Sequence, residues 1–409
     1  MASNLDSGLK TAEFQASPVP APEALIARAK EMIPSLKARA RQCVADRNVP
    51  TETIAEMKDA GFFRVMQPKR FGGYEMHPNV FFDIQRQLSE GCMSTAWVYG
   101  VVGCHPFQLA LFDERAQIEV WGDDQDMLVS STYQPVGKVE RTEGGFHLSG
   151  RWPFSSGSVH CGWVLLGAIA PGESEGSPPE MCTMLLPRQD YVIDESKWFT
   201  FGLQGTGSHD IVVDRAFVPE YRIHRASDGY LCKNPGQAIN TAPLYTMPWG
   251  QFFLRAVSSA AFGAGHAAVD AALEIMKSRV SKATSKASKD DQVLQGAIAA
   301  TEAQLLEMEL SLSATFDEIM SYLERGERIS VDKRIFWTYQ SATVVQRLAR
   351  LVDAMVERLG SRAIYMTSGI VQPWQDILAA RAHVANDPYS KTEEMTTVLT
   401  GGTPPPGFY

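Results

Sequence analysis

The sequence lacks the patterns that mark several large classes of protein. No stretch approaches the roughly 20 consecutive apolar residues that a helix needs to cross a bilayer. The N-terminal residues up to Pro22 hold no apolar run of the kind found in secretory signals. There is no CxxC pair and no HExxH, and the eight histidines show no metal-ligand spacing. These absences argue against a membrane span, a secretory signal and a zinc or iron site.

Positive charge and cysteine are also scarce. The 38 Lys and Arg residues against 47 Asp and Glu give a formal net charge of −9, so we expect no basic face for nucleic acid. Six cysteines in 409 residues form no dense framework, which favours the reducing cytoplasm. With 44% hydrophobic and 21% charged residues, the composition predicts a globular protein of two or three packed units.

Three compositional regimes follow one another along the chain. After a flexible segment over residues 1–22, residues 23–126 carry helical patterns, including an apolar helix over 96–112. Residues 127–235 contain short β-rich runs separated by Gly, Pro and Ser, with an exposed hairpin loop over 171–179. We therefore expect a small β domain between two helical parts.

The last regime, residues 236–409, predicts a four-helix bundle. Ile298, Leu305, Leu312 and Ile319 fall seven apart, which is typical of a long helix with one buried stripe. The pattern spans residues 291–325, and the segments 251–277 and 332–359 are its expected antiparallel neighbours. The fold class is thus α+β and mostly α.

Two polar loops are candidates for ligand binding. In the first, residues 152–157, aromatic rings stand beside Ser155, Ser156 and a glycine, which suits a flat ligand with a polar edge. In the second, the glycine-rich loop 202–210, Thr206 and Ser208 offer hydroxyls before a strand. This loop is not a GxGxxG motif that opens a helix, so it does not support a Rossmann site. An ordinary turn and an ordinary hairpin explain the two loops equally well.

Two of the histidines are candidates for proton transfer. His105 ends an apolar segment and His383 lies in the last long helical pattern, and histidine is the side chain best suited to proton transfer near neutral pH. A hydrogen-bonded structural histidine is the commoner role for either residue taken alone. Trp97, Trp249 and the other tryptophans are by the same reasoning more typical of a core.

Taken together, these segments resemble a known family. The Phe71–Gly73 loop, the 202–210 loop with the following Asp214–Pro219, and the C-terminal bundle resemble the acyl-CoA dehydrogenases. The chain is more similar still to the flavin-dependent phenol hydroxylases of that fold, which act on 4-hydroxyphenylacetate or on the phenolic ring of opened steroids. The resemblance runs from about Leu25 to Pro388. The segments that carry it are 94–97, 105–112, 130–132, 155–157, 247–250 and 383–388.

The resemblance implies an acyl-CoA dehydrogenase-like architecture and an enzyme. Its activity would be that of the oxygenase component of a two-component monooxygenase, which hydroxylates a phenolic or fused aromatic substrate through a C4a-hydroperoxyflavin. The expected cofactor is reduced FMN, with FADH2 as the alternative. The expected partners are O2, a small aromatic substrate, a separate NAD(P)H-dependent flavin reductase and the other subunits of a homotetramer.

The resemblance also implies roles for individual residues. Catalysis would involve His105 and Ser131 at the phenol, Ser156 near the flavin N5, and His383 between flavin and substrate. Trp249 would join the substrate contacts. The implied flavin contacts are Trp97, Phe154, Ser155, Ser156, Thr206, Ser208 and Arg279.

Several positions depart from the family pattern. The stretch Gln372–Asp376 lacks the two arginines that often precede the last histidine. Gly250 and Ala385 stand where hydroxyphenylacetate enzymes carry an arginine and a tyrosine, which favours a larger and more apolar aromatic substrate.

Two alternative activities remain on the same scaffold. One is oxidation of nitrogen, sulfur or indole substrates. The other is acyl-CoA dehydrogenation, which is disfavoured because the segment 365–369 has no carboxylate to act as base.

Overall fold

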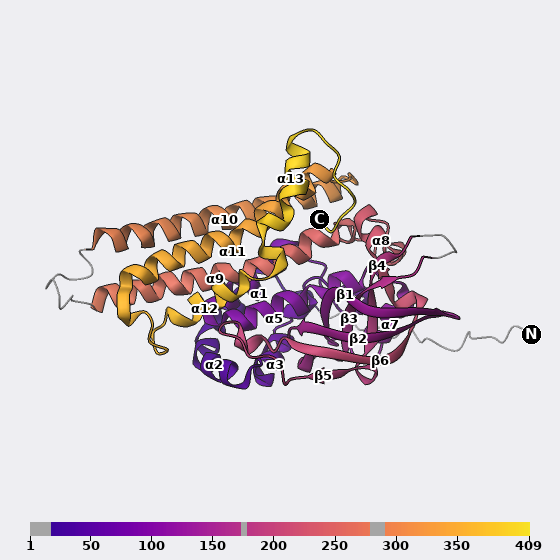
Figure 1. Cartoon of the computed structure of the whole chain (residues 1–409), viewed down its shortest axis with the longest axis horizontal. Coiled ribbons are helices and arrows are strands. Elements are labelled where there is room, and N and C mark those ends of the chain that lie inside the picture. The colour runs from indigo at the N-terminus through magenta and orange to yellow at the C-terminus, as the bar shows by residue number, and fades with distance from the viewer. Residues whose placement is uncertain (1–17, 173–177, 279–290) are drawn as a thin grey trace, which may run out of the picture.

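The chain places a helical part, a β-sheet and a helical bundle in that order, as the computed structural model shows (Figure 1). The structure describes residues 18–172, 178–278 and 291–409. Residues 1–17 of the expected flexible segment therefore lie outside the described residues. None of the helices among the described residues is long and apolar enough to span a membrane.

The N-terminal part consists of short helices, and two of them, Pro78–Gly91 and Met93–Gly103, are mostly buried. Its helices are α1 (Pro22–Glu31), α2 (Ile33–Asp46), α3 (Thr51–Asp59), α4 (Pro78–Gly91), α5 (Met93–Gly103), α6 (His105–Leu109) and α7 (Glu114–Trp121). The single helix predicted over residues 96–112 was wrong, because the chain breaks between α5 and α6 at Cys104. Pro106 lacks the N–H that would continue the α5 ladder and instead suits the first turn of a new helix.

A seven-stranded sheet follows, and its strand order is β5-β6-β2-β1-β3-β4-β7. The strands are β1 (Val129–Thr142), β2 (Gly145–Ser155), β3 (Trp163–Ala170), β4 (Glu180–Pro187), β5 (Val192–Asp194), β6 (His209–Pro219) and β7 (Ile223–Arg225). The β-rich runs at residues 163–170, 181–186 and 211–218 of the sequence coincide with β3, β4 and β6. Strands β3 and β4, on either side of the hairpin loop expected at residues 171–179, pair antiparallel. Residues 173–177 of that loop lie outside the described residues.

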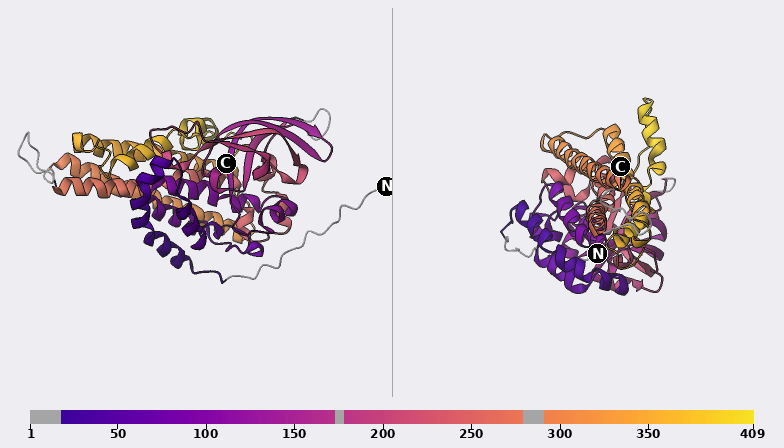
Figure 2. Two further views of the ribbon diagram at one scale, coloured as in Figure 1. Left: turned by 90° about the horizontal axis from the view of Figure 1, so that it is seen from below. Right: turned by 90° about the vertical axis from the view of Figure 1, so that its left-hand side faces the viewer.

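The C-terminal part is the predicted helical bundle. Its helices are α9 (Trp249–Ser278), α10 (Gln292–Glu324), α11 (Val331–Leu359), α12 (Val371–Ala380) and α13 (Thr392–Leu399), and α8 (Ala226–Leu231) connects the sheet to them. Asp291 caps α10 by accepting hydrogen bonds from two backbone N–H groups, so the helix begins where the pattern predicted. In Figure 2, α9, α10 and α11 run side by side away from the sheet.

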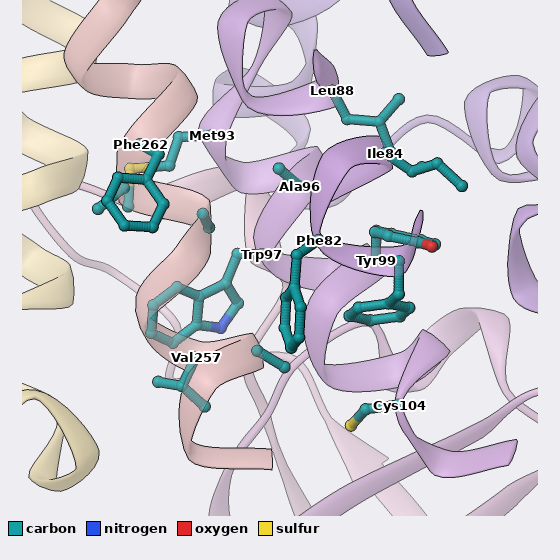
Figure 3. Close-up of a cluster of buried hydrophobic side chains, with 14 of the residues drawn as sticks. Phe82, Ile84, Leu88, Met93, Ala96, Trp97, Tyr99, Cys104, Val257 and Phe262 are labelled. Atoms are coloured by element: carbon teal, nitrogen blue, oxygen red, sulfur yellow. The ribbon is translucent and has the colours of Figure 1, made fainter. Parts of the chain in front are cut away.

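Helix α9 joins the bundle to the N-terminal part. Its buried face packs on α4 and α5, and Gly263 allows the close approach, since a Cβ there would lie 2.2 Å from the backbone oxygen of Arg86. Figure 3 shows Trp97 of α5 on the same side as Val257 and Phe262 of α9 in this core. The site residues on α5 and α6 are therefore held by a continuous buried core.

Candidate active site

Three hydroxyl groups meet where β2 ends and β6 begins. The Ser156 Oγ lies 2.6 Å from the Ser208 Oγ, which in turn lies 2.7 Å from the Thr206 Oγ1. We call Ser156, Thr206 and Ser208 the hydroxyl cluster. The Gly157 N–H donates to the Thr206 backbone oxygen at 2.8 Å and fastens the two loops together. All three hydroxyl-bearing residues are buried.

Trp97 and His383 lie beside the hydroxyl cluster. The indole Nε1–H of Trp97 donates to the Ser156 Oγ at 3.3 Å, and the Trp97 ring meets the His383 ring edge to face at 5.7 Å. The His383 Nδ1 accepts the backbone N–H of Ala385 at 3.1 Å. Burial lowers the pKa of His383 to about 4, so the ring is neutral at pH 7 and its proton sits on Nε2.

His105 is the first residue of α6 and is fully buried. Burial lowers its pKa to about 3, so the imidazole is neutral. Its Nδ1 lies 3.5 Å from both the Tyr133 hydroxyl and the Cys104 sulfur. Its Nε2 has no hydrogen-bond partner among the described residues. An unpaired buried ring nitrogen costs free energy, and such groups in proteins call for an explanation.

Aromatic rings surround His105. The ring of Trp249 lies 6.3 Å away and that of Tyr133 6.2 Å away, and Phe253 packs on both of them. Ser131 lies two residues before Tyr133 on β1 and is near enough to the Tyr133 hydroxyl to oppose, in part, the rise in the pKa of Tyr133 that burial causes. We call His105, Ser131, Tyr133, Trp249 and Phe253 the aromatic cluster. None of them carries a formal charge at neutral pH.

The described residues around the hydroxyl cluster fit a flavin. The Ser155 Oγ is buried and has no partner within the part of the chain that the structure describes, so it is free to bond a polar ligand edge. The buried Trp97 ring, which hydrogen bonds to the adjacent Ser156, offers an apolar face for a flat ring system.

Comparisons with known proteins identify the family. Residues 23–121 match the family model for the acyl-CoA dehydrogenase N-terminal domain, and residues 256–388 match the model for the C-terminal domain. The oxygenase subunit HsaA of a flavin-dependent monooxygenase from Rhodococcus jostii is 33% identical over 362 residues, covering 88% of this chain and 94% of that protein. The chain belongs to the flavin-dependent monooxygenases of the acyl-CoA dehydrogenase fold.

Two further relatives support the membership. The crystal structure of the 3-HSA hydroxylase from Rhodococcus sp. RHA1 is 32% identical with a TM-score of 0.89, covering 94% of this chain and 99% of that one. The oxygenase component of an FADH2-dependent resorcinol hydroxylase from a Rhizobium species is 27% identical over 88% of this chain and 90% of that protein. The predicted fold and enzyme class of this monooxygenase are confirmed.

The structure distributes the predicted site residues between two groups. Trp97, Ser156, Thr206, Ser208 and His383 share one set of contacts, and His105, Ser131 and Trp249 share the other. Among the described residues, no hydrogen bond or ring contact joins His105 to His383. Arg279 lies outside the described residues.

Phe154 occupies a different place from the other predicted flavin contacts. Its backbone φ is +69°, in the left-handed region that bulky residues rarely adopt. The β2–β6 register shifts between Trp152 and Ser155, and Phe154 lies in that break. Its side chain is 56% exposed and meets Trp198 edge to face, so in this monooxygenase it lies at the surface, whereas the hydroxyl cluster is buried.

Sequence reasoning missed several buried polar groups of this monooxygenase. Tyr133 donates to the Gln108 side-chain oxygen at 2.5 Å, and Gln108 contacts His224. Asp376 accepts the Leu203 N–H at 2.6 Å. These residues lie far apart in the sequence, and no local spacing marks them. The one available signal was Asp376, a lone acid in an otherwise uncharged run over residues 371–380.

Proposed function

We propose that this monooxygenase hydroxylates a phenolic or fused aromatic substrate beside its hydroxyl group. It would use O2 and reduced flavin from a separate NAD(P)H-dependent flavin reductase. The observation that carries the proposal is the unpaired Nε2 of the neutral, fully buried His105 among aromatic rings. The relatives at about one-third identity support it, because they are named as oxygenase subunits and hydroxylases.

The hydroxyl cluster is proposed to hold the flavin. Ser155, Ser156, Thr206 and Ser208 would bind its polar groups, and Trp97 would cover part of the ring system. Reduced flavin, when bound, reacts with O2 and supplies the oxygen atom for hydroxylation. FMN is the proposed form with FAD as the alternative, and the name of the resorcinol relative supports the latter.

His105 is proposed to act as the base toward the substrate hydroxyl. Because its imidazole is neutral, Nε2 can accept a hydrogen bond from the phenol and take the proton as the ring attacks the oxygen donor. Removal of that proton makes the ring carbon beside the hydroxyl more nucleophilic. Burial keeps water from competing for Nε2.

His383 is proposed to supply a proton from the side of Trp97 and Ser156. The backbone N–H of Ala385 fixes Nδ1 as an acceptor, so Nε2 carries the hydrogen of the neutral ring. A donor at this place next to Trp97 and Ser156 suits a hydrogen bond to bound oxygen. Ser131 would assist at the phenol through its contact with Tyr133.

The aromatic cluster around His105 favours an apolar substrate. It includes no arginine or lysine that would pair with a carboxylate. Gly250 leaves no room for a large side chain, because a Cβ there would lie 3.0 Å from the backbone nitrogen of Tyr409. A fused or multi-ring phenol is therefore the proposed substrate class, and a homotetramer in the cytoplasm is the proposed state.

The test is a single turnover under 18O2. The protein is mixed anaerobically with reduced FMN or FAD and 2-naphthol or a substituted phenol, and 18O2 is then admitted. We expect a dihydroxylated product that carries one 18O atom. Formation of hydrogen peroxide alone, across a panel of phenols and fused aromatics and with either flavin, would contradict the proposal.

A further inference from the structure

A chain of buried hydrogen bonds connects His105 to a capping box beyond β7. At its far end, the Asn234 side chain accepts the backbone N–H of Gln237, while the Gln237 side chain accepts the Asn234 N–H at 2.8 Å. A backbone N–H only donates, so the Asn234 atom that faces it is the oxygen Oδ1. This contact fixes the direction of every hydrogen bond that follows.

His224 is the next member of the chain. Its Nε2 lies 2.8 Å from the Asn234 Oδ1, so Nε2 carries the hydrogen and donates. Burial lowers the pKa of His224, which keeps the ring neutral and leaves Nδ1 as an acceptor. The Gln108 Nε2 lies 3.4 Å from that Nδ1 and donates to it. The orientation of the Gln108 amide is thereby set.

Tyr133 links Gln108 to His105 through its hydroxyl group. Its hydroxyl donates to the Gln108 Oε1 at 2.5 Å, and burial raises the Tyr133 pKa well above its ordinary value, so the hydroxyl stays protonated. Because its one hydrogen is used, the oxygen faces the His105 Nδ1 at 3.5 Å as an acceptor. The Cys104 thiol donates to the Val101 oxygen, so its sulfur also faces Nδ1 as an acceptor.

We propose that this hydrogen-bond chain holds His105 in the tautomer with its hydrogen on Nδ1 and keeps the Nε2 lone pair turned to the substrate hydroxyl. Tyr133, Gln108 and His224 are then positioning residues for the base. The inference rests on the proposed function, since it assumes that an aromatic ligand meets Nε2. It adds that the site selects ligands that donate a hydrogen bond at this point and rejects those that only accept one.

The test compares two ligands of the same shape. 2-Naphthol carries a hydroxyl that donates, and isoquinoline N-oxide carries at the corresponding position an oxygen that only accepts. Dissociation constants are measured by calorimetry with the full-length protein. We expect the parent to bind 2-naphthol at least about tenfold more tightly, as one hydrogen bond to a buried group can provide.

The informative variants are Tyr133→Phe and Gln108→Leu. Once the hydrogen-bond chain is broken, the His105 hydrogen can move to Nε2. Isoquinoline N-oxide should therefore bind each variant more tightly than it binds the parent. The ratio of the dissociation constants of the two ligands should then approach one. A gain in affinity is not what damage to the fold produces. The matched control is Tyr99→Phe, a buried tyrosine whose hydroxyl donates to the Phe62 backbone oxygen. The ratio of the two dissociation constants in this variant should equal that of the parent.

The outcomes separate this inference from the proposed function. An unchanged ratio in both variants would overturn the positioning role, even if the parent hydroxylates 2-naphthol. A changed ratio without any oxygenated product would support the positioning role and contradict the proposed function. Failure of both ligands to bind the parent would contradict both.

Discussion

The Asp376 carboxylate on α12 accepts the backbone N–H of Leu203 at 2.6 Å and so ties the bundle to the loop that carries Thr206 and Ser208. The Gln372 amide donates to the same oxygen at 2.8 Å. A Cβ on Gly202 would lie 2.1 Å from the Gln375 backbone oxygen, so the two segments are in close contact. The proposed flavin site thus depends on an interface between the sheet and the bundle.

Asp376 makes the stability of this interface depend on pH. Burial raises its pKa to about 7 from an ordinary value of 3.8. The folded state therefore keeps a proton that the unfolded state loses, and stability falls as pH rises from about 4 to about 7. We expect Asp376→Asn to abolish this part of the pH dependence. At pH 8 the free energy of unfolding of the variant should then exceed that of the parent by at most about 4 kcal/mol.

The measurement is urea unfolding of both proteins from pH 4 to pH 8. The asparagine oxygen can still accept the Leu203 N–H, so the two stabilities should converge toward pH 4. Parallel curves over the whole range would show that Asp376 does not titrate as described.

The hydroxyl cluster should contribute to flavin affinity. Ser208→Ala removes the hydroxyl that lies between those of Ser156 and Thr206. Each of these two hydroxyls then loses one hydrogen-bond partner. We expect the dissociation constant for reduced flavin to rise about tenfold, which corresponds to roughly 1.4 kcal/mol. This dissociation constant is measured by anaerobic titration with fluorescence detection.

Thr301→Val provides the control for that variant. Its hydroxyl is also buried but donates to the Ala297 oxygen of its own helix α10, so flavin affinity should not change. Equal effects of the two substitutions would mean that loss of any buried hydroxyl weakens binding, and the cluster would have no special role.

Gly250 is expected to be required for packing of the C-terminal residues. The last residue, Tyr409, is 5% exposed, and the hypothetical Cβ of Gly250 would lie 3.0 to 3.2 Å from backbone atoms of Phe408 and Tyr409. Gly250→Ala should therefore destabilise the protein by about 1 kcal/mol or more and increase hydrogen exchange over residues 403–409.

Gly296→Ala is the matched substitution. Gly296 also lies in a helix, but a Cβ there meets no atom within 4 Å. Replacing it should stabilise the protein by up to about 1 kcal/mol through helix propensity. The prediction on Gly250 fails if both alanines stabilise equally and exchange at the C-terminal residues stays the same.

The sequence predicted local features of the structure better than contacts between distant segments. The seven-residue spacing from Ile298 to Ile319 predicted α10 almost to its ends, because helix periodicity is a short-range property. The break between α5 and α6 was missed although Pro106 was visible, since the apolar run continues through it.

The candidate site was predictable only in part for the same reason. Histidine and serine stood out by type, and the resemblance to a family assigned them. Tyr133, Gln108 and His224 belong to different elements and meet only through the sheet and the α6 helix. Asp376 meets Leu203 across 173 residues. Contacts of this kind have no signature in a single sequence.

The role of His105 as the base is tested most directly by the fate of oxygen in His105→Asn. Parent and variant are each loaded with reduced flavin and 2-naphthol, exposed to O2 once, and analysed for hydroxylated product and hydrogen peroxide per flavin. We predict that the parent forms mostly product. In the variant, hydroxylation should slow by about 10²-fold or more, as expected for loss of a general base, and peroxide should replace product with flavin affinity unchanged. Equal product yields and equal hydroxylation rates in the two proteins would contradict the role of His105 as the base.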